Sequence, residues 1–196
     1  MDWNEYIDKY WSYYLIYEEE FLETTRYVSL DESNYATHSI EFGRLLVSIC
    51  SEIDNVFKVL CKELDFKKRQ HIGKYAENLL PKYPEMCSEA FTTFFSCIEL
   101  VPFEKWSASS GSKSLWWWDE AAKLKHNRSK FEKNGNLKNV IYALCGLYML
   151  ELYAIREIEN TIKIPGKPYR NSKIFKAKKR ITKWRFEGNI LIEGVE

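Results

Sequence analysis

Residues 116–128 read WWWDEAAKLKHNR and join three consecutive tryptophans to a Lys-His-Asn-Arg cluster. The stretch predicts one helix, in which successive residues are rotated by about 100°. Four residues then share one side: Trp117, Ala121, Leu124 and Arg128. Three others share the opposite side: Asp119, Ala122 and His126. One side can anchor the helix in a core while the other presents chemistry, so this helix carries the candidate site.

The composition indicates one globular domain. The chain has 196 residues, of which 45% are hydrophobic and 29% are charged, and this length can bury a substantial core. Residues 1–5 lack the basic and apolar regions of a signal peptide, and the longest apolar run, residues 140–150, is too short to cross a bilayer. The sequence therefore predicts a cytoplasmic protein with no membrane contact.

The cysteines and histidines form no familiar metal-binding pattern. None of the five cysteines belongs to a CxxC pair, and the three histidines complete no zinc-ligand spacing. Cys50 and Cys61 fall on one side of a predicted helix and are expected to pack as small hydrophobic residues. We expect reduced thiols, no bound metal and no cofactor.

The first of three long predicted helices covers residues 2–26. Its apolar residues recur at alternating gaps of four and three: Trp3, Ile7, Tyr10, Tyr14, Tyr17 and Phe21. Glu18, Glu19 and Glu20 are expected to lie partly on the solvated side. A tyrosine-rich seam of this kind is typical of helix packing within a domain, and its length also suits a homodimer contact.

The second and third long helices are predicted from Ser39 and from Asn136 to about Ile162. Ser39 has the side chain of an N-cap residue, and an apolar stripe runs from Leu45 towards Leu64. The third helix is apolar nearly all round in its middle, where Gly146 would admit a neighbouring helix closely. We expect a mainly α helical bundle over residues 1–164, followed by a basic tail over residues 165–196 with a β-hairpin.

Two interpretations of Glu41 and Arg44 follow from their place beside the apolar stripe. They begin a polar line on the second helix that continues through Ser48, Glu52 and Asn55. Such a line is often a solvated edge held by pairs three or four residues apart. Alternatively, Glu41 and Arg44 face the His126 helix and help to build its site.

The tail is strongly basic, in contrast to the N-terminal third. Residues 1–65 carry a local charge of −9, from fourteen acidic and five basic residues, whereas residues 166–196 carry +6, from nine basic and three acidic residues. Aromatic residues are interleaved with these cations, as in proteins that follow a phosphate backbone and stack bases. Docking of the tail on the acidic N-terminal helix would explain the same composition.

His126 offers an imidazole beside fixed positive charge, which suits metal-independent RNA cleavage. One group deprotonates the ribose 2′-hydroxyl, another protonates the leaving oxygen, and a cation stabilises the charged phosphorane. Histidine and arginine can fill these roles without a metal. A lone histidine near lysine and arginine is also common on ordinary protein surfaces, so both interpretations stay open.

The tract Trp117-Trp118, Lys125-His126-Asn127-Arg128 and the apolar helix after it resemble the C-terminal half of an HEPN-like domain, and residues 39–54 resemble its first long helix. The resemblance covers about residues 35–160. It implies a helical bundle, commonly a homodimer, and in many members a metal-independent ribonuclease of prokaryotic defence or toxin–antitoxin systems. The family signature places an arginine four to six residues before its histidine, but no arginine lies at any of these spacings before His126, and Ala121 and Ala122 stand at the equivalent positions. This departure implies reduced or absent nuclease activity.

Two hypotheses result. The first is an RNA-directed HEPN-like protein, either a metal-independent endoribonuclease or a degenerate relative of one. The second is a non-catalytic homodimeric interaction or regulatory module that binds protein or nucleotide. On the first, the catalytic candidates are His126, Arg128 and Arg44. The substrate-binding candidates are Lys125, Lys123, Glu41, Asp119, Lys178, Lys179, Arg180 and Trp184.

Overall fold

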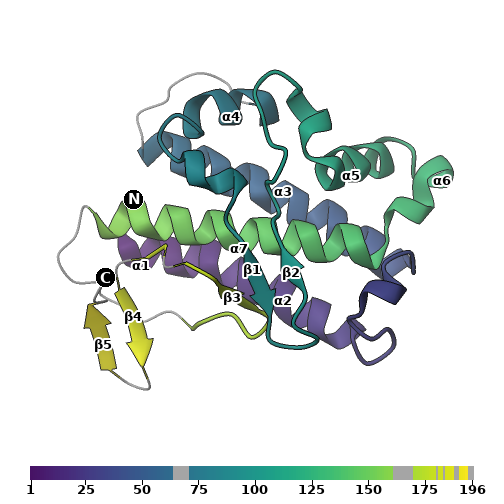
Figure 1. Ribbon diagram of the computed structural model, residues 1–196, viewed down its shortest axis with the longest axis horizontal. Helices are drawn as coiled ribbons and strands as arrows, with labels where there is room; N and C mark the ends of the chain where they lie inside the picture. The colour runs from purple at the N-terminus through teal and green to yellow at the C-terminus, as the bar shows by residue number, and fades with distance from the viewer. Residues whose placement is uncertain (64–70, 161–169, 180, 183, 188–189, 194–196) are drawn as a thin grey trace.

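The computed structural model describes residues 1–63, 71–160, 170–179, 181–182, 184–187 and 190–193, and it is mainly helical. The α-helices are α1 (Trp3–Tyr6), α2 (Ser12–Thr24), α3 (Ile40–Glu63), α4 (Ile72–Leu79), α5 (Trp116–His126), α6 (Arg128–Phe131) and α7 (Leu137–Glu159). The strands are β1 (Phe91–Thr93), β2 (Glu99–Leu100), β3 (Phe175–Ala177), β4 (Trp184–Glu187) and β5 (Ile190–Glu193). The predicted fold class, mainly α with a small β-containing tail, is confirmed (Figure 1).

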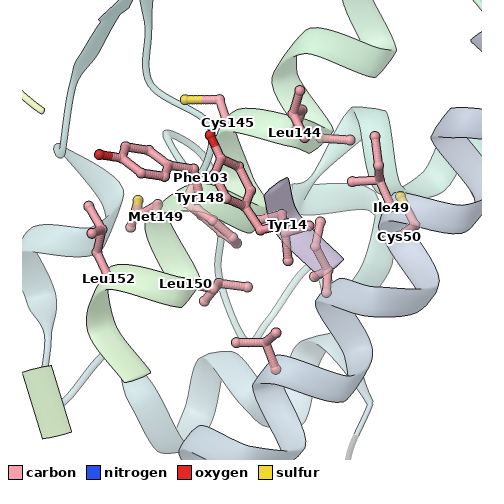
Figure 2. Close-up of a cluster of buried hydrophobic side chains, with 14 of the residues drawn as sticks. Tyr14, Ile49, Cys50, Phe103, Leu144, Cys145, Tyr148, Met149, Leu150 and Leu152 are labelled. Carbon is pink, nitrogen blue, oxygen red and sulfur yellow. The ribbon is translucent and has the colours of Figure 1, made fainter. Parts of the chain in front are cut away.

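Helices α3 and α7 form the centre of the bundle and pack side by side (Figure 1). The predicted cap of α3 is present, because the Ser39 hydroxyl accepts a hydrogen bond from the Phe42 backbone N–H at 3.0 Å. Nearly all of α7 is buried, and Figure 2 shows its Leu144 side chain lying toward Ile49 of α3. The N-terminal ends of the two helices lie close together. Gly43 of α3 and Gly135, just before α7, approach each other so closely that a Cβ on Gly135 would lie 2.6 Å from the Gly43 Cα.

The predicted N-terminal helix is present but contains a π-helical segment, Ile7–Trp11, between α1 and α2. The Ser12 backbone N–H donates to the Ile7 carbonyl, five residues back, and this wider turn rotates the buried stripe. Trp11 and Glu18 are consequently buried, whereas Tyr10 and Tyr17 of the predicted seam are only partly covered. The expectation that Glu18 is solvated was wrong.

Glu18 is buried because its carboxylate binds residues 172–174, which pack against the N-terminal helix. Its carboxylate accepts hydrogen bonds from the Tyr14 hydroxyl at 2.6 Å and from the Lys173 backbone N–H at 2.9 Å. The Ser172 hydroxyl also donates to it. Arg170 and Lys173 meanwhile form ion pairs with Glu19, at 2.9 and 3.4 Å. Residues 170–175 therefore dock on the acidic N-terminal helix, as one of the two interpretations of the tail proposed.

Two small antiparallel sheets complete the fold. In the first, of order β2-β1-β3, Phe91 of β1 lies opposite Leu100 of β2 and Ala177 of β3. In the second, β4 pairs with β5, which confirms the predicted hairpin. No helix within the described residues is long and apolar enough to cross a membrane.

Candidate functional site: a groove between α3 and α5

Helix α5 ends at His126, so Arg128 does not share a helical face with Trp117 as the spacing predicted. Asn127 leaves the helical conformation, at φ −148° and ψ 77°, and its side chain accepts a hydrogen bond from the Lys130 backbone N–H at 3.3 Å. Asparagine is a favoured N-cap, and here it begins the short helix α6. The break places Arg128 at the exposed start of α6, beyond the end of α5.

The anchoring side of α5 is as predicted. Trp117 is fully buried, and its indole N–H donates to the Pro102 carbonyl at 2.8 Å. Ala121 and Leu124 are buried on the same side. Gly146 of α7 admits the Trp117 ring, since a Cβ on that glycine would lie 3.2 Å from ring carbons. These contacts fix the orientation of α5, and hence of its other side.

The other side of α5 faces a groove of about 450 Å³ that α3 closes from the opposite edge. Its apolar lining consists of Val47, Cys50, Trp118, Ala121 and Ala122. Its polar lining consists of Ser51, Asp54, Asn55, Lys125 and His126. A flat indole beside amide, hydroxyl and cationic groups can hold a planar ring with a charged substituent.

The cations at the end of α5 have no carboxylate partners in the part of the chain that the structure describes. Lys125, Arg128 and Lys130 are exposed and form no ion pair with any described residue. Lys123, only two residues before Lys125, behaves differently: its ammonium lies 2.9 Å from Asp119 and 2.7 Å from Glu120. Hydrogen bonds to Glu120 and Asp119 raise the pKa of Lys123. Lys123 and Asp119, both substrate-binding candidates, therefore satisfy each other, whereas Lys125 is available to an anion.

Arg44 and Glu41 do not join this groove. The Arg44 guanidinium lies 2.8 Å from Glu20 of α2 and 2.5 Å from Glu41 of its own helix. The hydrogen bond from Arg44 lowers the pKa of Glu41, and hydrogen bonds to Glu41 and Glu20 raise the pKa of Arg44. The interpretation of paired residues at a solvated edge is confirmed for Glu41 and Arg44, but Glu52, further along the same predicted line, is buried. The groove beside His126 contains no guanidinium among the described residues.

Lys178 and Lys179, the tail candidates whose side chains the structure describes, lie away from this groove. Lys178 forms an ion pair with Glu99 of β2, and Lys179 is exposed. Arg180 lies outside the described residues, and of Trp184 only the backbone, in β4, is described. None of these residues lines the α3–α5 groove in the part of the chain that is described.

Buried carboxyl groups are the feature that sequence reasoning missed. Glu151 of α7 is fully buried, and one of its oxygens accepts a hydrogen bond from the Tyr6 hydroxyl at 2.5 Å. Burial raises the pKa of Glu151 to about 8. Burial also raises the pKa of Glu52, whose carboxylate accepts a hydrogen bond from Asn55 at 3.1 Å. The available signal was a single acidic residue directly after the apolar run at 140–150.

The cysteines are free thiols, and Cys50, Cys61 and Cys145 are buried, as expected for small hydrophobic residues. Burial raises the pKa of the Cys50 and Cys145 thiols, which disfavours the reactive thiolate. Among the residues that the structure covers, no group of three or more His, Cys, Asp or Glu side chains is placed to hold a metal ion. Comparisons with protein-family models, curated proteins and solved structures gave no match to this chain.

Proposed function

We propose that this protein binds single-stranded RNA in the α3–α5 groove. The observation that carries the proposal is that Lys125 and His126 border an indole-lined groove while Lys125 has no carboxylate partner among the described residues. Trp118 can stack a base, and Lys125 can contact a phosphate. The resemblance to HEPN-like domains supports the same ligand class.

We propose that a single chain binds RNA without cleaving it. His126 could act as acid or base, but Arg44 is engaged by two carboxylates and Arg128 lies beyond the end of α5. Turnover therefore requires a guanidinium from a second copy, in the homodimer that the resemblance implies. A cytoplasmic role in prokaryotic defence belongs to the same proposal, and the free thiols are in keeping with a reducing compartment.

Fluorescence anisotropy with a labelled unstructured RNA tests binding. We expect Lys125→Ala to weaken binding and to reduce the slope of log affinity against log salt by about 1, because one phosphate contact is lost. Lys123→Ala is the matched control on the same helix, and it should leave both quantities unchanged. Equal effects of the two substitutions would contradict the proposal.

A second assay tests turnover. The native protein is incubated with RNA in EDTA at concentrations that span monomer and dimer, beside His126→Ala. Cleavage that appears only with the dimer and disappears in the variant would support the second copy as the source of the guanidinium. Cleavage by a strictly monomeric native protein that is absent from the variant would overturn the proposal that one chain binds without turnover.

The alternative is a non-catalytic module that binds a protein partner. Large apolar side chains on the surface favour it: Phe94 and Phe95 on the β1–β2 turn, and Ile16 on α2, are each at least half exposed. A native protein with no salt-dependent RNA affinity would favour this alternative over the RNA proposal.

A further inference from the structure

A second groove, of about 860 Å³, lies on the other side of α3, between that helix and the N-terminal helix. Its lining includes Tyr10 and Tyr13 from the N-terminal helix and Lys58 and Lys62 from α3. Tyr10 belongs to the π-helical segment, a type of turn that is frequent at functional sites. The Tyr13 side chain is 49% exposed, so its ring is accessible to a ligand.

Asn55 of α3 lines both grooves. Its amide nitrogen donates to Glu52 at 3.1 Å, which fixes the side chain and leaves its carbonyl oxygen available as an acceptor. Next to it, Asp54 lines the α3–α5 groove and Lys58 lines the second groove, and the two are joined by an ion pair at 2.5 Å. The grooves therefore meet at one exposed amide on the surface of α3.

Lys62 is the cation of the second groove that is left for a strand. Lys9 and Lys58 also line the groove, but Lys9 lies 2.8 Å from Glu5 and Lys58 lies 2.5 Å from Asp54, whereas Lys62 forms no ion pair with any described residue. Asp8 and Glu52 add carboxyl groups to the same lining. Glu52 is 92% buried, given its exposed fraction of 8%, so its carboxyl presents little surface to a phosphate. The remaining surface combines the phenol rings of Tyr10 and Tyr13 with the ammonium of Lys62, and a ring beside a cation suits a sequence-tolerant path for single strands.

We propose that one RNA strand crosses α3 at Asn55 and occupies both grooves, with bases stacked on Trp118 in the first and on Tyr13 in the second. The proposal rests on the RNA-binding function proposed above and adds the path of the strand over α3, the second groove and a length requirement. A strand of about four nucleotides fills the α3–α5 groove alone, whereas a strand of about twelve reaches both grooves.

Tyr13→Ala provides the test, with Ile16→Ala as the matched control. Both residues lie on α2 and are about equally exposed, at 49% and 50%, but only Tyr13 lines the groove. Affinities are measured by anisotropy for oligouridines of about four and about twelve nucleotides. We expect Tyr13→Ala to weaken the longer strand about fivefold or more, because one stacked base is lost, and to leave the shorter strand unchanged. Ile16→Ala should change neither, and Tyr13→Phe should retain the native affinity since it keeps the ring.

Lys62→Ala is a second variant in case Tyr13→Ala does not fold. It should reduce the salt slope for the longer strand by about 1 and leave that of the shorter strand unchanged. If both variants bind the longer strand like the native protein while Lys125→Ala does not, the second groove is not part of the path. An equal loss for both lengths in Tyr13→Ala would also overturn the crossing. A native protein that binds neither strand would instead refute the underlying function.

Discussion

Trp117 and Trp118 are adjacent in sequence and lie in opposite surroundings. Trp117 is sealed between Gly146 of α7 and the Pro102 carbonyl, with no exposed surface. Trp118 is half-buried and lines the α3–α5 groove. The two sides of α5 therefore have different roles. The sealed side, which carries Trp117, packs in the core and stabilises the domain, whereas the open side, which carries Trp118, leaves an indole ring accessible to a ligand. Substitutions on the two sides should accordingly affect different measurements.

The largest expected effect is on the sealed side. Trp117→Ala should lower the free energy of unfolding by about 3–5 kcal/mol, because it empties a fully packed site and leaves the Pro102 carbonyl without its donor. Urea denaturation measures the change. Trp118→Ala, the matched control, should cost less than about half as much, since its ring is already partly hydrated. Equal losses would show that the two sides are not separate.

The pH dependence of the free energy of unfolding tests the burial of the Glu151 carboxyl group in the core. Burial raises the Glu151 pKa from 4.5 to about 8, so between these values the folded state holds a proton that the unfolded state has released. Stability therefore falls as pH rises through this window, by up to about 1.4 kcal/mol per pH unit. Glu151→Gln should flatten the curve, since the amide oxygen can still accept from Tyr6. Urea titrations from pH 5 to 8 measure both proteins, and parallel curves would refute this origin of the slope.

On the open side, Trp118→Ala should weaken RNA binding by about 1–3 kcal/mol through the loss of one stacked base. Trp118→Phe keeps an aromatic ring and should restore most of the affinity. Anisotropy titrations at fixed salt give the comparison. If the alanine variant binds RNA as the native protein does, Trp118 does not contact the strand.

The smallest expected effect belongs to the paired cation. Lys123→Ala removes an exposed ion pair, and such pairs contribute little to stability. Its unfolding midpoint should match that of the native protein. A clear loss of stability would mean that the Lys123 pair, rather than the sealed side alone, holds α5 in place.

The sequence predicted the parts of the fold that rest on long regular patterns. The cap at Ser39, the apolar α7 and the close approach at Gly146 were all predicted, because each depends on local chemistry or on periodicity over several turns. The π-helical segment was not, because it has no signal in residue type. The burial of Glu18 follows from its partners Ser172 and Lys173, more than 150 positions away in the chain.

The candidate site was predicted in part for the same reason. His126 and Lys125 do border one groove, because both follow from the periodicity of α5. Arg128 was placed wrongly because Asn127 can either continue a helix or cap the next one, and here it caps α6. Arg44 has its decisive partner, Glu20, on another helix, and no spacing rule within α3 could identify that contact.

The most direct test of the central claim is to map where RNA contacts the protein. RNA carrying 4-thiouridine is cross-linked to the native protein, and the modified peptides are identified by mass spectrometry. The account predicts cross-links in residues 47–55 and 118–130, on the two walls of the groove and at the exposed start of α6. Cross-links confined to the basic residues 170–187, with none at the groove, would contradict it.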